Sequence, residues 1–164
     1  MVSVYAQGGN RGAPFFAEAD DVDTCAALLR FDDDTLATVT ATRYNGAGHD
    51  VRLEVCGSEG ARFVGLDDRA PLPSAEPEPR LSWRRAADPY ATFMERFHDA
   101  YVTELGAFIE VAAGRAPSPC TPAEALEALY VAEACERSRR TGAPVAVADV
   151  RAAPGAPGGG SPTG

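Results

Sequence analysis

The fold is decided by residues 43–60, which read RYNGAGHDVRLEVCGSEG. The first half of this stretch is a glycine-punctuated polar loop, and the second half alternates, with Val51, Leu53 and Val55 on one face. A Gly-Ser-Glu-Gly turn follows, and the alternation resumes as far as Leu66. Loops held by rigid strands often carry binding residues. The stretch therefore predicts a β-hairpin with a candidate ligand-facing loop at its entrance.

A second hairpin is predicted just before this stretch. Residues 22–31 form an apolar run that suits a buried strand, and residues 35–42 alternate threonine with small or apolar side chains. Three aspartates at 32–34 separate the two strands and favour a turn over a calcium loop, because the closing glutamate of a calcium loop is missing. Strands that follow one another this directly favour an antiparallel sheet.

The first residues, Met1–Ala6, also alternate like a strand. The glycine-rich segment Gln7–Pro14 reads as a flexible connection, since the lysine of a phosphate-binding loop does not follow it. Asp20, Asp21 and Asp23 read as a solvated entrance to the next strand rather than as ligands of a divalent cation.

Two helices are predicted in the second half. Pro89 suits a first helical turn, and an apolar stripe that includes Phe93, Tyr101 and Phe108 runs at helical spacing towards Gly114, so we expect this stripe to be core. The second helix begins with a Thr-Pro-Ala-Glu capping box at 121–124 and should end at Arg140, before Gly142. Val145 and Val147 suggest a closing strand.

Composition excludes several classes of protein. The net charge of −9 and the pI of about 4.7 disfavour binding to nucleic acid or to an anionic membrane surface. No apolar run is long enough to span a membrane, and we expect a cytoplasmic protein, because the amino terminus does not resemble a signal peptide. The four cysteines show no metal-ligand spacing and read as buried thiols.

The chain is expected to form one domain over residues 1–150, followed by a disordered Pro/Gly tail over 151–164. The proline-rich segment 67–88 should be an exposed excursion. All 15 basic residues are arginine, so the chain has no lysine with which to form a Schiff base or to donate a proton.

His49 and Asp50 are the only concentrated candidates for acid-base chemistry, in a loop that also carries Tyr44 and Asn45. Neighbouring residues on a strand point to opposite faces, so one of the pair would face a ligand while the other orients the loop. A plain hairpin connection explains the same residues equally well. No Ser-His-Asp arrangement, zinc spacing or dinucleotide fingerprint is visible, so we assign no catalytic, cofactor-binding or metal-binding residue.

Five blocks of the sequence carry a joint resemblance: residues 2–8, 21–24, 48–60, 100–108 and 132–138. Together they resemble the carboxy-terminal domain of the Gfo/Idh/MocA oxidoreductases, and in particular the inositol 2-dehydrogenase branch. The resemblance covers nearly all of residues 1–150 and implies an α+β fold, with an open, mainly antiparallel sheet and helices packed on one face. It also implies an amino-terminal Rossmann domain that binds NAD or NADP and supplies the catalytic lysine and an Asp-x-x-x-His pair, none of which can be assigned in this chain.

In inositol dehydrogenases a Tyr-Gly-Tyr-Asp stretch contributes a substrate-facing tyrosine. By resemblance, its second tyrosine falls on His49 and its aspartate on Asp50, while Tyr44 and Asn45 are further candidates by position. A histidine can hydrogen-bond the hydroxyl of a sugar or polyol, but it can also carry charge near neutral pH and so favour an acidic sugar.

The sequence therefore predicts the substrate-binding and oligomerisation domain of an NAD(P)-dependent sugar or polyol dehydrogenase, truncated or separately encoded and inactive alone. Its expected partners are a Rossmann domain, a sugar or polyol ligand, and further copies of the chain through the sheet face. The alternative is a non-catalytic module that binds a small ligand or associates through its sheet.

Overall fold

The structure is a computed structural model that describes residues 1–45, 48–70, 72 and 87–153. The chain divides into two compact units, one made of residues 1–44 and 118–164 and the other of residues 45–117. Each unit is described by itself. Within the described part of the chain, none of the helices combines the length and the apolar character that crossing a membrane requires.

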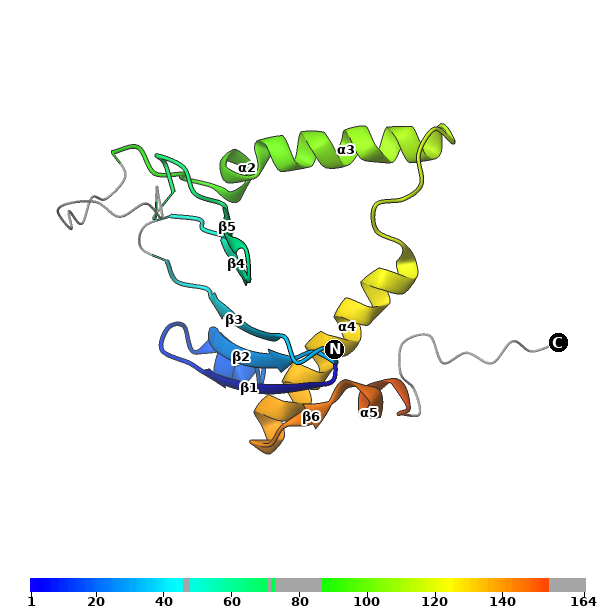
Figure 1. The fold of residues 1–164 in the computed structure, drawn as a ribbon. Coiled ribbons are helices and arrows are strands. Elements are labelled where there is room, and N and C mark those ends of the chain that lie inside the picture. The colour runs from blue at the N-terminus through cyan, green and yellow to red at the C-terminus, as the bar shows by residue number, and fades with distance from the viewer. Residues whose placement is uncertain (46–47, 71, 73–86, 154–164) are drawn as a thin grey trace. The chain divides into compact units, whose positions relative to one another are not determined.

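The first unit is built on a four-stranded sheet in the order β3-β2-β1-β6 (Figure 1). Its strands are β1 (Ser3–Gly9), β2 (Thr24–Arg30), β3 (Leu36–Thr42) and β6 (Val145–Ala146). All three pairings are antiparallel. The long helix α4 (Pro122–Thr141) packs across one face of this sheet. The α+β class and the open antiparallel sheet are therefore confirmed.

The strand register explains why only one face of the sheet is covered. Val4 pairs with Leu29, and both are buried on the side of α4. Their neighbours Tyr5 and Leu28 pair with each other on the opposite side, where they are 39% and 46% exposed. Alternation along antiparallel strands thus sorts apolar side chains into a covered face and an open face.

The core of the first unit is small and lies between α4 and the sheet. Its buried apolar members are Val4, Leu29, Tyr130, Ala134, Val147 and Val150. Burying one such side chain is worth about 1.5–3 kcal/mol for the larger residues. The short helix α5 (Val147–Arg151) supplies the last two members, so the strand expected through Val147 ends at Ala146 and the chain turns into a helix instead.

Helix α4 begins where the sequence predicts and ends at Thr141, one residue beyond the expected Arg140. The Thr121 hydroxyl accepts a hydrogen bond from the Glu124 backbone N–H, and the Glu124 carboxylate accepts one from the Thr121 N–H. Gly142 ends the helix in the left-handed conformation, with φ 69°. These contacts satisfy backbone groups that a helix end leaves free.

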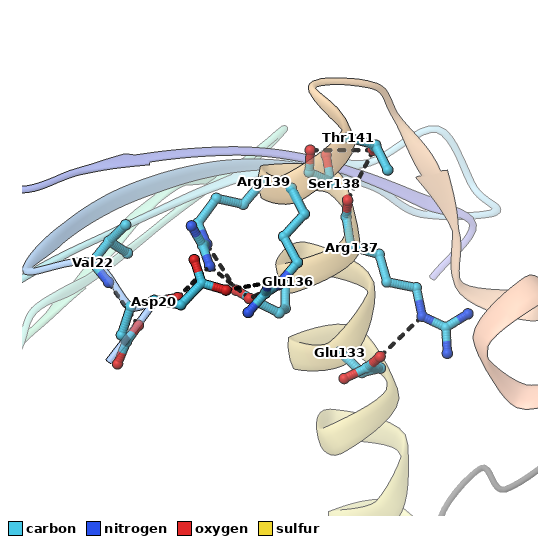
Figure 2. A network of polar contacts seen from close by, with 10 residues as sticks. Asp20, Val22, Glu133, Glu136, Arg137, Ser138, Arg139 and Thr141 are labelled. Carbon is cyan, nitrogen blue, oxygen red and sulfur yellow. Dashed lines mark hydrogen bonds and ion pairs between the residues drawn. The ribbon is translucent and has the colours of Figure 1, made fainter. Parts of the chain in front are cut away.

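The last turns of α4 are tied to the turn before β2 by a charged network (Figure 2). Glu136 accepts hydrogen bonds from the guanidinium groups of Arg139 and Arg140. Arg139 also donates to the backbone carbonyl of Asp20, and Arg140 pairs with the Asp20 carboxylate. The arginines at this helix end therefore hold another segment in place as well as complementing the helix dipole.

Within its described residues, the second unit contains a two-stranded hairpin and two helices. The hairpin pairs β4 (Leu53–Gly57) with β5 (Gly60–Val64), as the stretch 43–60 predicts. The helix expected to start near Pro89 is divided at Phe97 into α2 (Phe93–Arg96) and α3 (His98–Ala112), and the Thr92 hydroxyl caps α2 by accepting from the Glu95 N–H. A further short helix, α1 (Phe15–Glu18), belongs to the first unit.

The apolar stripe of α3 is not core, contrary to the prediction. No residue of this helix is buried, and Leu105 and Phe108 are 63% and 66% exposed. Helical periodicity identifies an apolar face but does not provide the surface that covers it.

The cysteines also differ from the prediction of buried thiols. Cys56 and Cys120 are exposed, Cys25 and Cys135 are partly buried, and none forms a disulfide. The greater part of the predicted excursion, residues 73–86, and most of the predicted tail, residues 154–164, lie outside the described residues.

Candidate functional site

His49 is exposed at the entrance to the β4–β5 hairpin. Its imidazole meets the Phe93 ring edge-on, with ring centroids 6.3 Å apart. The preceding Gly48 has φ 104°, and a Cβ at this position would lie 2.9 Å from the backbone oxygen of Tyr90. Glycine is therefore required here both for the backbone conformation and for the close approach of residue 90. The loop that carries His49 is packed against the segment that leads into α2.

Asp50 lies next to His49 but has a different environment. Its side chain is only 9% exposed, and its Oδ2 forms an ion pair with Arg52 Nε at 2.8 Å. The other carboxylate oxygen, Oδ1, is buried and has no hydrogen-bond partner among the described residues. The structure thus gives the two neighbours different surroundings, an exposed imidazole and a largely buried carboxylate with one unused acceptor.

Arg96 on α2 contacts the residues that follow strand β5. Its guanidinium donates to Asp67 Oδ2 at 3.0 Å and to the Gly65 carbonyl at 2.8 Å, and its side chain is 10% exposed. A Cβ at Gly65 would lie 2.2 Å from the Val51 carbonyl oxygen, so residues 65 and 51 are in close contact. Arg96 therefore anchors the strand end that supports the His49–Asp50 segment.

Tyr44, another predicted binding residue, belongs to the first unit, where its side chain has a structural contact. The Tyr44 hydroxyl accepts a hydrogen bond from the Ala13 N–H at 2.7 Å. The ring lies so close to Gly12 that a Cβ there would come within 2.1 Å of it. Asn45 is exposed, and its carbonyl accepts a hydrogen bond from the Gly48 N–H. His49 and Asp50 are thus brought together with Asn45 in the second unit, while Tyr44 is placed in the first.

Asp23 is the polar residue that sequence reasoning placed wrongly. It is 2% exposed rather than solvated, and its Oδ2 accepts hydrogen bonds from the Arg11 and Gly12 backbone N–H groups, both at 2.7 Å. Its Oδ1 accepts from the Thr24 hydroxyl at 2.9 Å. Burial alone would raise the pKa of Asp23, but these hydrogen bonds outweigh burial and hold the pKa below its usual value.

The same contacts change the picture of the glycine-rich segment. Gly8 and Gly9 belong to β1, and the Asn10 side chain accepts from the Asp23 N–H, so the segment is held by Asp23 rather than being a loose connection. In the sequence, the only sign of this arrangement is that Asp23 stands directly before Thr24, the first residue of β2. Because charged side chains are mostly exposed, the sequence favours an exposed Asp23.

Other chemistry finds little support in the described residues. No three potential metal-ligating side chains gather among them. A shallow depression of about 420 Å³ lies at one end of the first unit's sheet, with Gln7, Thr24, Thr40 and Thr42 in its lining. Its side chains offer hydroxyl and amide groups but no acid-base pair.

Solved structures that match this fold include dehydrogenases. A probable dehydrogenase from Thermotoga maritima matches with a TM-score of 0.76 and 26% identity, over 90% of this chain and 43% of that chain. Scyllo-inositol dehydrogenase from Lactobacillus casei, determined with bound NAD(H) and scyllo-inositol, matches with a TM-score of 0.72 and 26% identity, over 90% of this chain and 42% of that one. The fold of this chain thus matches one α+β domain of these larger proteins.

The family can be stated more closely. Residues 1–147 match the model of the oxidoreductase family C-terminal alpha/beta domain of the Gfo/Idh/MocA proteins, and the chain belongs to this family. Myo-inositol dehydrogenase Hyg17 of Streptomyces leeuwenhoekii is 36% identical over 149 residues, which make up 89% of this chain and 43% of that protein. The chain therefore spans less than half the length of such relatives.

Proposed function

We propose that this chain is the substrate-binding and oligomerisation domain of an NAD(P)-dependent dehydrogenase of sugars or polyols. The observation that carries the proposal is the exposed His49 on a loop of fixed geometry, in a domain of a family whose relatives include inositol dehydrogenases. His49, Asp50 and Asn45 would contact the ligand, and Tyr44 is a further candidate.

The described residues do not themselves fit a dinucleotide. The backbone N–H groups of Arg11 and Gly12 in the glycine-rich segment, which might have bound a phosphate, already donate to Asp23. Binding of NAD or NADP is accordingly proposed for a Rossmann domain outside residues 1–164, and no step of hydride transfer is assigned to this chain.

A fusion tests the proposal. The amino-terminal part of a related inositol dehydrogenase would be joined to Met1, and NADH formation would be measured with a panel of inositols and sugars. We expect activity from the fusion and none from the 164-residue chain with added NAD. His49→Ala in the fusion should raise KM for the ligand by about tenfold, the cost of losing one hydrogen bond to a ligand hydroxyl.

His98→Ala is the matched control, because this second histidine is exposed on α3 and pairs only with its neighbour Asp99 among the described residues. A fusion that folds and binds NAD but oxidises none of the panel would contradict the proposal. An active 164-residue chain would contradict the need for a second domain.

A non-catalytic module that associates through its sheet is the second candidate. The supporting observation is the open face of the first unit's sheet, where Tyr5, Leu28 and Leu36 are 39%, 46% and 64% exposed. Under this proposal the chain forms dimers or larger assemblies, and Leu28→Asp shifts the mass measured by sedimentation towards the monomer. A monomeric wild-type chain would count against sheet-mediated assembly under either proposal.

A further inference from the structure

Phe93, the first residue of helix α2, is an aromatic side chain that the apolar stripe predicts as core but that is 51% exposed. Its ring packs edge to face with the His49 imidazole, and the two ring planes lie at 75° to each other. Aromatic pairs with this geometry are favourable beyond the area that they bury. The contact therefore restrains an exposed imidazole that would otherwise turn freely in water.

We infer that Phe93 is a positioning residue of the candidate site, which holds the His49 imidazole in the orientation that meets a ligand. The inference rests on the proposed function and adds to the site a residue from outside the loop that carries His49. A freely turning side chain loses rotational freedom when a ligand binds, and this loss weakens binding. A neighbouring ring that orders the imidazole in advance removes part of this cost, whatever the chemical class of the ligand.

The position of Phe93 is itself fixed by the hydrogen bonds that start α2. The Thr92 hydroxyl accepts from the Glu95 N–H at 3.2 Å, and the Glu95 carboxylate accepts from the Ala91 N–H at 3.1 Å. Glu95 also forms an ion pair with Arg69. The backbone on both sides of Phe93 is therefore held in place before a ligand binds.

The backbone of His49 is fixed by the same segment. Gly48, with φ 104°, approaches the Tyr90 carbonyl oxygen so closely that a Cβ would lie 2.9 Å from it. Residue 90 lies three positions before Phe93, so one short segment sets both the His49 backbone and the ring beside its imidazole. With both backbones fixed, the orientation of the imidazole depends on the ring that it contacts.

The positioning can be measured in the whole chain without a ligand. The chain contains two histidines, so a His49→Gln variant assigns their imidazole NMR signals, and His98, whose side chain is 74% exposed, is the internal reference. In Phe93→Leu we expect the order parameter of the His49 imidazole to fall towards that of His98, whereas Phe93→Tyr, which keeps the ring, should retain it.

Met94→Leu is the matched control, because Met94 is the next residue of α2 and is 57% exposed. It should leave the His49 order parameter unchanged, and neither it nor Phe93→Leu should lower the unfolding midpoint appreciably, since both side chains are about half exposed. A His49 order parameter that is the same in Phe93→Leu as in wild type, or that already equals that of His98 in wild type, would overturn the inference.

The fusion with the amino-terminal part of an inositol dehydrogenase tests whether this orientation matters for the ligand. Phe93→Leu should raise KM about 2- to 10-fold and leave kcat nearly unchanged, whereas Met94→Leu should change neither. In a His49→Ala background, Phe93→Leu should have no further effect on KM, because it acts through the imidazole.

An unchanged KM in Phe93→Leu, or an equal rise in KM with and without the imidazole of His49, would overturn the inference while the activity of the fusion still supports the proposed function. A fusion that oxidises none of the panel would contradict the proposed function instead. In that case the order parameters of the 164-residue chain still decide whether Phe93 positions His49.

Discussion

Single buried polar side chains hold this domain together at points where its elements meet. The Ser138 hydroxyl, which is 0% exposed, accepts from the Ala6 N–H at 2.9 Å and donates to the Ala143 carbonyl at 2.7 Å. One side chain on α4 therefore satisfies a strand amide of β1 and a carbonyl in the turn beyond the helix. Removing this hydroxyl costs more free energy than the two hydrogen bonds themselves, because it leaves the Ala6 N–H and the Ala143 carbonyl without partners.

Ser138→Ala should accordingly lower the free energy of unfolding by about 1–3 kcal/mol, the cost of a buried donor left without an acceptor. Urea denaturation followed by circular dichroism measures the change. Ser58→Ala is the control, because this serine is exposed in the turn between β4 and β5, and it should stay within about 0.5 kcal/mol of wild type. Equal effects of the two substitutions would contradict the role of Ser138.

Gly48→Ala tests the fixed geometry of the His49 loop. The φ of 104° and the 2.9 Å approach of the Tyr90 oxygen predict a loss of about 1–3 kcal/mol in the free energy of unfolding, together with shifted His49 NMR signals. Gly106→Ala, in the middle of α3 where a Cβ meets nothing within 4 Å, should instead stabilise the chain by about 0.5–1 kcal/mol. If Gly48→Ala changed neither the free energy of unfolding nor the His49 signals, the geometry of the loop would not be fixed.

For single residues, the sequence identifies candidate site residues, but it does not predict how buried they are or which groups they contact. It marks His49 and Asp50 as candidates, but it does not show that Asp50 is largely buried with an unused oxygen, or that Asp23 is buried at all. Both facts depend on which backbone amides and side chains come together from elsewhere in the chain, and local pattern carries no such information.

At the scale of elements, boundaries that depend on local chemistry are predicted well. Helix α4 runs from Pro122 to Thr141 because its capping box and its terminal glycine act within a few residues of each end. The break at Phe97 is not predicted, since the apolar periodicity continues through it. Strand β6 is shortened to two residues because α5 takes Val147 into the core.

The charged network at the end of α4 predicts a pH dependence. Hydrogen bonds from Arg139, and then from Arg140, lower the pKa of Glu136 from 4.5 to about 2. A carboxyl with a lower pKa in the folded chain stabilises the fold above its unfolded pKa, and this contribution is lost as pH falls from about 4.5 to about 2. Because the side chain is 36% exposed, we expect about 1 kcal/mol rather than the full value of the shift.

Glu136→Gln should remove this contribution, so its free energy of unfolding should be about 1 kcal/mol lower than wild type at pH 6 and nearly equal to it at pH 2. Urea melts across this pH range provide the comparison. Glu104→Gln on α3 is the control, because this glutamate is exposed. If the free energies of unfolding of Glu136→Gln and wild type differed by the same amount at every pH, the predicted contribution of ionised Glu136 would be contradicted.

At the scale of the whole molecule, the core is concentrated in the first unit. Tyr130 on α4 is 8% exposed and packs in the apolar cluster, whereas Phe108 on α3 is 66% exposed. Sequence reasoning treated both helices as contributors to one core, because both have apolar faces. Which face is covered depends on the arrangement of the rest of the protein, and periodicity within one helix does not report it.

Two aromatic substitutions separate these cases. Tyr130→Ala should lower the free energy of unfolding by about 3 kcal/mol or more through loss of buried area and creation of a cavity. Phe108→Gln should change it by less than about 0.5 kcal/mol in the isolated chain, where the ring is already hydrated. Thermal and urea denaturation of both variants give the comparison. A large decrease in the free energy of unfolding of Phe108→Gln would show that the apolar stripe of α3 is covered in solution.

The Asp23 carboxylate occupies the backbone N–H groups of the glycine-rich segment that could otherwise bind an anion. A nucleotide phosphate at this segment would have to displace the Asp23 carboxylate, which is part of the chain and already accepts two hydrogen bonds from backbone N–H groups, both at 2.7 Å. With its pKa held below the usual value, this internal ligand remains charged throughout the physiological range and does not vacate its position. Competition therefore closes this segment to phosphates, so the loop at His49 is the surface where we propose that a ligand is recognised.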